Sequence, residues 1–220
     1  PNLKGYETAL EVGVKEIALF SATSDSFTQK NINCSVEESF SRMTELANMA
    51  KRDGVQIRGY VSTAFGCPYE GKISVDKLLK VVERFFKLGV YEVSIGDTIG
   101  VATPGQVNEI LKRLDHEFDK DKLAMHFHDT RGMATTNVLV SLENGFYIFD
   151  SSSGGLGGCP YAKGASGNVA TEDLIYLFNS LGIEHGVDLN SLIEASKFIL
   201  EKLQKETTSK FLKATLSSEK

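Results

Sequence analysis

Short hydrophobic runs alternate with longer segments of helical period along the whole chain. The runs are rich in Val, Ile, Phe and Tyr and are short enough to form buried strands. They cover residues 15–21, 56–62, 91–98, 123–129 and 146–152. Because each run is followed by a helical segment, with no hairpin-like second run, the pattern predicts a parallel α/β architecture.

The segments between the runs are typical of amphipathic helices with defined ends. Ser35 is placed as an N-cap, and Glu38, three residues later, completes a capping box. Ser74 opens a second helix, which is predicted to end at Gly89. The remaining predicted helices cover residues 105–118, 133–144, 171–181 and 189–204.

Polar residues at the ends of successive runs distinguish between two parallel folds. A dinucleotide-binding sheet needs a glycine-rich turn directly after its first strand, and residues 20–23 offer none. Polar strand ends are instead typical of a (β/α)8 TIM barrel, which places its active site there. Five strands cannot close such a barrel. We therefore expect residues 1–220 to form one catalytic-domain fragment, with the last five β/α units and C-terminal helices, and about three units to precede Pro1.

Composition excludes several classes of protein. With 41% hydrophobic residues, a net charge of -5 and no block of Lys and Arg, the chain is expected to be globular and not to bind nucleic acid. It contains no apolar run of roughly 18 residues and no signal peptide, so no membrane association is expected. Three cysteines, an odd number, predict free thiols in a reducing compartment. We expect the cytoplasm, with the mitochondrial matrix as the alternative if a targeting segment precedes residue 1.

The segment His126-Phe127-His128 is the most informative part of the sequence. Alternate side chains of a strand point to the same face, so the two imidazoles are expected on one face, roughly 6 to 7 Å apart along the backbone. This spacing allows both rings to bind one metal ion. A hydrogen-bonded pair of histidines at a strand end is the alternative, and the spacing alone leaves both open.

A glycine-rich segment, residues 153–168, follows the last run and is predicted to form a lid over a ligand. It contains Cys159 and Asn168. A thiol on an exposed polar loop is placed for acid/base or nucleophilic work, although an inert loop cysteine has the same appearance. Asp97 ends another run between two glycines, where it is a candidate ligand, base or turn-forming residue.

Together these motifs resemble the 3-hydroxy-3-methylglutaryl-CoA lyase family. The resemblance runs from residue 1 to about residue 210, and it rests on residues 31–35, 95–100, 126–130 and 154–162. It implies a metal-dependent TIM-barrel lyase that cleaves 3-hydroxy-3-methylglutaryl-CoA, an acyl-CoA substrate, to acetyl-CoA and acetoacetate with Mg²⁺ or Mn²⁺.

By the same resemblance, three side chains are expected to bind the metal and two to serve catalysis. The metal ligands are His126, His128 and Asn168. Cys159 is expected to work in proton transfer, and Asp97, aided by a histidine, to take the proton of the substrate hydroxyl. A homodimer is compatible with the sequence.

The resemblance also defines what differs or is missing. The family's first-strand metal-binding aspartate and the preceding arginine are not in this sequence, so little turnover is expected from these 220 residues alone. Arg131 occupies a position where the family carries tyrosine, and it is expected either to reach the acidic groups of CoA or to cap the next helix. The alternatives are a related Claisen-condensing synthase and a catalytically incomplete fragment that acts only as a binding partner.

Overall fold

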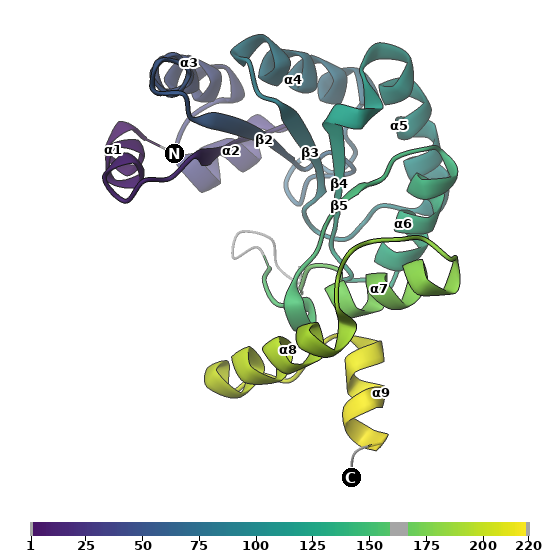
Figure 1. Cartoon of the computed structure of the whole chain (residues 1–220). Coiled ribbons are helices and arrows are strands. Elements are labelled where there is room, and N and C mark those ends of the chain that lie inside the picture. Colours follow the sequence, from purple (N-terminus) through teal and green to yellow (C-terminus); the bar gives the residue numbers. More distant parts are fainter. Residues whose placement is uncertain (1, 159–166, 219–220) are drawn as a thin grey trace.

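The fold is a parallel sheet whose outer face is covered by helices (Figure 1). The computed structural model describes residues 2–158 and 167–218. Within them, five strands pair in parallel in the order of the sequence. The strands are β1 (Glu16–Ala22), β2 (Gln56–Ser62), β3 (Glu92–Asp97), β4 (Leu123–Phe127) and β5 (Ile148–Asp150). Sequential parallel order is what consecutive β/α units produce.

The helices follow the strands along the chain. In Figure 1 the helices α3 to α6 lie along the outer side of the sheet, while α7, α8 and α9 lie beyond β5. The helices are α1 (Leu3–Glu11), α2 (Asp25–Ile32), α3 (Val36–Asp53), α4 (Val75–Leu88), α5 (Pro104–Glu117), α6 (Ala134–Glu143), α7 (Thr171–Ser180), α8 (Leu189–Leu203) and α9 (Lys210–Ser218), with short 3-10 turns η1 (Lys120–Lys122) and η2 (Ser153–Gly155).

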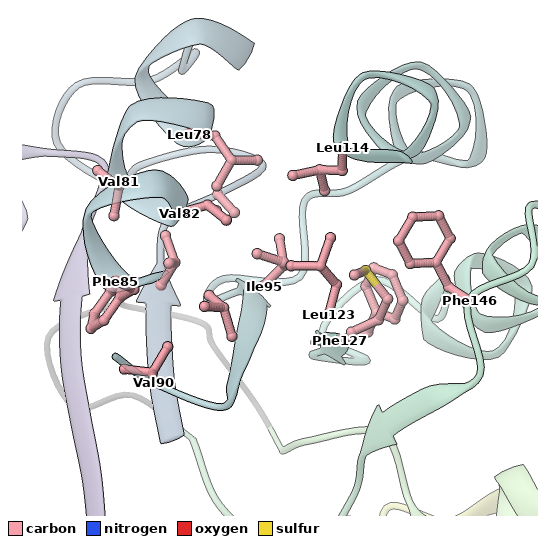
Figure 2. Close-up of a cluster of buried hydrophobic side chains, with 14 of the residues drawn as sticks. Leu78, Val81, Val82, Phe85, Val90, Ile95, Leu114, Leu123, Phe127 and Phe146 are labelled. Carbon is pink, nitrogen blue, oxygen red and sulfur yellow. The ribbon is translucent and has the colours of Figure 1, made fainter. Parts of the chain in front are cut away.

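The main core lies between the sheet and this helical layer. Ile95 of β3 and Leu123 of β4 are fully buried, as is Phe85 of α4 (Figure 2). Phe85 packs so closely on β2 that a Cβ atom built on Gly59 would lie 2.8 Å from its ring. Because Gly59 has no side chain, α4 can approach the sheet this closely.

The predicted helix ends are confirmed. Ser35 Oγ accepts a hydrogen bond from the amide of Glu38, and the Glu38 carboxylate accepts one from the amide of Ser35. Ser74 caps α4. Gly89 ends that helix with a φ of 86°, a left-handed conformation that glycine adopts without strain.

Helices α1, α2 and α9 were not expected from the sequence. Helix α2 is polar and has no clear apolar stripe, so its pattern is weak. Its N-terminus is stabilised from a distant loop: the carboxylate of Glu70 accepts hydrogen bonds from Ser24 Oγ at 2.6 Å and from the amide of Ser26 at 3.0 Å. Ser24 also caps the helix locally by accepting from the amide of Phe27, but the contribution of Glu70 from a distant loop has no local signature.

Strand β5 is shorter than the run that predicted it. The amide of Phe146 bonds to the carbonyl of Ser141, so the start of the run belongs to the turn after α6. At the other end, the amide of Ser152 bonds to Val169. Hydrogen bonding outside the sheet thus limits the strand to three residues.

Candidate active site

A cavity of about 370 Å³ opens over the inner face of the sheet, at the carboxyl ends of the strands. It is lined by Ala18, Phe20, Phe27, Asn31, Tyr60, Val61, Ser62, Ser94, Gly96, Thr98, His126, His128 and Gly158. A larger cavity, about 760 Å³, lies between the loops after β2 and β3, but its lining has no histidine. The two histidines therefore lie in the smaller cavity.

His126 and His128 both line this cavity. Their ring centroids are 5.3 Å apart, and the planes are tilted by 38°. The prediction that the two rings share a face is confirmed. Strand β4 ends at Phe127, so His128 stands just beyond the regular ladder, where a neighbouring segment can approach it.

Asn168, at the end of the glycine-rich segment, lies beside His128 because the chain there pairs with the end of β4. It forms an isolated antiparallel bridge with His128, and the amide of Val169 bonds to the carbonyl of Phe127 at 3.0 Å. Residues opposite each other in such a pair project to the same face, with Cβ atoms about 5 Å apart. The structure thus brings Asn168 beside His128.

Two polar atoms of this pair are buried without a hydrogen-bond partner among the described residues: Nδ1 of His128 and Oδ1 of Asn168. The amide nitrogen of Asn168 donates to the carbonyl of Leu156 at 2.9 Å, which directs its oxygen away from that contact. Buried polar atoms are rarely left unpaired. An electron-pair acceptor such as a cation would satisfy both atoms.

His126 is held differently. Its Nδ1 lies 3.1 Å from Oδ2 of Asp150, which stands opposite it on β5. The same Asp150 oxygen accepts a hydrogen bond from Ser94 Oγ at 2.6 Å, and Oδ1 lies 2.8 Å from Nη1 of Arg58. Nε2 of His126 is therefore the nitrogen left for a ligand.

The electrostatics of the site keep His128 neutral. The pKa of His128 is lowered to about 4, mainly by burial and to a smaller extent by the neighbouring His126. Burial opposes ionisation of Asp150, but hydrogen bonds from His126 and Ser94 and the charge of Arg58 outweigh it and lower its pKa. A neutral imidazole with an available lone pair is the form that binds metals.

Asp97 occupies a different position. Its two carboxylate oxygens accept hydrogen bonds from the amides of Val101 and Ala102, at 2.9 and 3.0 Å. The side chain is buried, and it does not belong to the cavity lining, although Gly96 and Thr98 on either side do. Burial raises the pKa of Asp97, and the two amides offset only part of that effect. In this structure the carboxylate organises the loop after β3.

Arg131 does not cap helix α6, one of the two roles expected for it, and its contact with CoA stays a prediction. Its Nη1 donates hydrogen bonds to the carbonyls of Ile99 and Gly100, at 2.8 and 3.0 Å. Helix α6 is approached instead by Asp129, which accepts from the amide of Ala134. Arg131 thus joins the loop after β4 to the loop that follows Asp97.

Cys159 and most of the predicted lid, residues 159–166, lie outside the described residues. The start of the segment is anchored at η2. The amide of Gly154 donates to the carboxylate of Glu172, which is fully buried and also contacts Ser196 Oγ. The described flanks of the segment therefore begin and end beside the cavity, at Gly158 and Asn168.

The donors present fit a hard divalent cation. Among residues 2–158 and 167–218, no three His, Cys, Asp or Glu side chains come together as a metal site. The two imidazoles and the amide oxygen of Asn168 form an incomplete set, which a carboxylate and water would complete. The polar contacts of Asp150 with Arg58, Ser94 and His126 were not predicted from the sequence. A signal was present, since Arg58, Tyr60 and Ser94 alternate with apolar residues within their strands.

Comparison with known proteins shows the family of the chain. The family model described as HMGL-like matches residues 1–199. The chain belongs to the HMGL-like family. The mouse protein "Hydroxymethylglutaryl-CoA lyase, mitochondrial" is 52% identical over 215 residues, which are 98% of this chain and 66% of that protein. The zebrafish "3-hydroxy-3-methylglutaryl-CoA lyase, cytoplasmic" is 50% identical over 98% of this chain and 64% of its own length.

Solved structures of HMGL-like proteins share the fold. Hydroxymethylglutaryl-CoA lyase from Pseudomonas aeruginosa superposes with a TM-score of 0.95 and 47% identity, over 99% of this chain and 73% of that one. An HMG-CoA lyase from Acinetobacter baumannii, in complex with coenzyme A and 3-methylmalate, superposes with a TM-score of 0.92 and 40% identity. The match covers 97% of this chain and 70% of that one. The predicted TIM-barrel class is confirmed, with the five strands forming part of the barrel.

The chain spans 66% of the length of the mouse and human relatives. The relatives include mitochondrial and cytoplasmic proteins. In the described part of this HMGL-like chain, none of the helices has the length and apolar character that crossing a membrane requires.

Proposed function

We propose that this protein is a metal-dependent carbon–carbon lyase that cleaves 3-hydroxy-3-methylglutaryl-CoA to acetyl-CoA and acetoacetate. The observation that carries the proposal is the pairing of Asn168 with His128, which lines the cavity together with His126. One polar atom each of His128 and Asn168 is buried and unpaired among the described residues. Relatives that carry this activity in their names are about half identical to the chain. The Claisen-condensing and non-catalytic alternatives are not favoured by these relatives.

We propose Mg²⁺ or Mn²⁺ as the cofactor, held by Nε2 of His126, by His128 and by Oδ1 of Asn168. Such a cation would lower the pKa of the substrate hydroxyl and withdraw charge from the thioester carbonyl. The imidazole of His128 remains neutral at pH 7, since its pKa is about 4. Hydroxyl, carbonyl and amide oxygens are the ligands that such hard ions prefer.

Two proton transfers complete the proposed reaction. The tertiary hydroxyl loses its proton as the carbon–carbon bond breaks, which gives acetoacetate and the enolate of acetyl-CoA; the enolate carbon then gains a proton. We propose that the Sγ of Cys159 supplies that second proton, since a thiol is a suitable acid for the enolate carbon and the described flanks of its segment, Gly158 and Asn168, lie beside the cavity. The role of Asp97 as the base that takes the first proton stays a prediction. Its raised pKa supports this role, whereas its hydrogen bonds to two backbone amides argue against it.

We propose an acyl-CoA as the partner molecule, supported by the coenzyme A complex of the Acinetobacter baumannii relative. A reducing compartment is proposed for the protein, supported by the free buried thiols of Cys34 and Cys67. The cytoplasm is our first choice, and imaging of the tagged full-length protein tests it against mitochondria.

The test is product formation by the full-length protein in which this sequence occurs. With Mg²⁺, one acetyl-CoA and one acetoacetate are expected for each substrate molecule consumed, and a chelator is expected to abolish both until metal is restored. Cleavage that persists at the same rate in the chelator, or no cleavage with Mg²⁺ or Mn²⁺ added, contradicts the proposal.

A further inference from the structure

The carboxylate of Asp150 occupies the centre of a polar network on the inner face of the sheet. Side chains from three other strands meet it: Arg58 of β2, Ser94 of β3 and His126 of β4. Asp150 itself lies on β5, directly opposite His126 in the strand register. The four groups therefore come from four adjacent strands and depend on the sheet for their arrangement.

Each oxygen of Asp150 has a defined partner. Oδ1 lies 2.8 Å from Nη1 of Arg58. Oδ2 accepts from Ser94 Oγ at 2.6 Å and faces Nδ1 of His126 at 3.1 Å. A carboxylate only accepts hydrogen bonds, so its contact with His126 requires a proton on Nδ1.

The arginine is fixed in turn. Nε of Arg58 lies 2.6 Å from the carboxylate of Glu92, and the guanidinium stacks on the ring of Tyr60, 4.8 Å from its centroid. Arg58 and Glu92 are about 90% buried, so neither side chain is free to turn toward solvent. A network that is satisfied at each member holds its side chains in one arrangement.

We infer that Asp150 is a positioning residue that fixes the tautomer and orientation of His126, with Arg58 and Ser94 fixing Asp150. With the proton on Nδ1, the lone pair of His126 resides on Nε2, the nitrogen that the proposed function uses for the cation. His128 has no comparable partner, since its Nδ1 is unpaired among the described residues. The two imidazoles are thus unequal: His126 is oriented by a carboxylate before a ligand binds, and His128 has no such partner among the described residues.

This inference deepens the proposed function and rests on it, but its test does not depend on activity. The nitrogen-15 resonances of His126 in the metal-free full-length protein report which ring nitrogen carries the proton. Protonated Nδ1 is expected in the natural sequence. Asp150→Ala removes the acceptor, so a shift toward protonated Nε2, the form that free imidazole side chains favour, is expected. Unchanged resonances in this variant overturn the inference.

Mn²⁺ affinity, measured by electron paramagnetic resonance, is the second measurement. Asp150→Ala is expected to weaken binding by about 10- to 100-fold, the range typical of a lost partner behind a metal-binding histidine. Asp150→Asn retains an oxygen that accepts from Nδ1 and is expected to keep the tautomer and most of the affinity. Loss of the tautomer in the Asn variant as well contradicts the acceptor role.

Asp76→Ala is the matched control, because Asp76 lies on α4 with 74% of its side chain exposed and contacts Arg113, outside the network of Asp150. It is expected to change Mn²⁺ affinity by less than about threefold and to leave the tautomer unchanged. If Asp150→Ala fails to fold, Asp150→Ser replaces it, since a serine hydroxyl is too short to reach Nδ1; an unaltered tautomer there overturns the inference. If the natural protein binds no Mn²⁺, the proposed metal site fails, while the resonances still decide the role of Asp150.

Discussion

His128 and Asn168 stand opposite each other in an isolated antiparallel bridge, although His128 follows strand β4 and Asn168 is the last residue of the glycine-rich segment. Each carries a buried polar atom that has no hydrogen-bond partner in the described residues. Leaving such atoms unpaired costs about 1–3 kcal/mol each. A cation that both atoms bind would offset this cost, which is the basis of the first prediction.

His128→Ala is expected to weaken Mn²⁺ binding by at least about 100-fold, more than the loss of a residue behind a ligand costs. Isothermal titration of the full-length protein measures it. His116→Ala is the control, because His116 is on the surface of α5 with 81% of its side chain exposed. Equal affinities for the two variants would remove His128 from the site.

Cys159→Ala is expected to retain substrate and metal binding but to lower kcat by about 10²- to 10⁴-fold, the usual size of an acid/base contribution. Steady-state kinetics with substrate titration separates kcat from KM. Cys67→Ala is a suitable comparison, since Cys67 is a buried thiol that donates to Ser24 Oγ outside the cavity. Normal cleavage by the Cys159 variant contradicts proton transfer by this thiol.

Asp97→Asn separates two roles for this carboxyl group. If Asp97 is the base, kcat falls by about 10²-fold or more while the protein remains folded. If Asp97 only organises its loop, the NH2 group of Asn faces one of the two backbone N–H groups, and one hydrogen bond is lost. The free energy of unfolding then falls by about 1–3 kcal/mol. Urea unfolding and kcat, measured on the same preparation, distinguish the outcomes.

Gly59→Ala is expected to destabilise the fold by about 1–3 kcal/mol, because the added methyl group would lie 2.8 Å from the ring of Phe85. Gly105→Ala is the matched control: nothing lies within 4 Å of its built Cβ, and its position in the first turn of α5 tolerates alanine. Equal urea midpoints for the two variants would show that α4 yields to the added methyl group.

Stability is expected to depend on Glu70 at acidic pH. Burial alone would raise its pKa, but hydrogen bonds from Ser24 and Ser26 and the charge of Lys77 lower it from 4.5 to about 2. Because the folded pKa lies below the unfolded one, this contribution is complete above about pH 4.5 and is lost as pH falls toward 2. Glu70→Gln should therefore be less stable than the natural protein at pH 7, with the difference vanishing near pH 2.

Local chemistry in the sequence was enough to predict most of the fold. Hydrophobic runs, the Ser35 and Glu38 capping box and the glycine at position 89 act within a few residues, so they can be interpreted without coordinates. The spacing of His126 and His128 likewise placed both rings on one face, because alternation along a strand is a property of the backbone. The sequence therefore determined the parallel α/β class and the histidine pair.

Only the tertiary structure decided which side chains surround that pair. Arg58, Ser94 and Asp150 lie on separate strands and meet through the register of the sheet, which no local pattern encodes. Asn168 reaches His128 because the returning chain pairs with the end of β4, and α2 is completed by Glu70 from a distant loop. Contacts between distant segments depend on how the whole chain packs, whereas a strand or a cap depends on its neighbours in sequence.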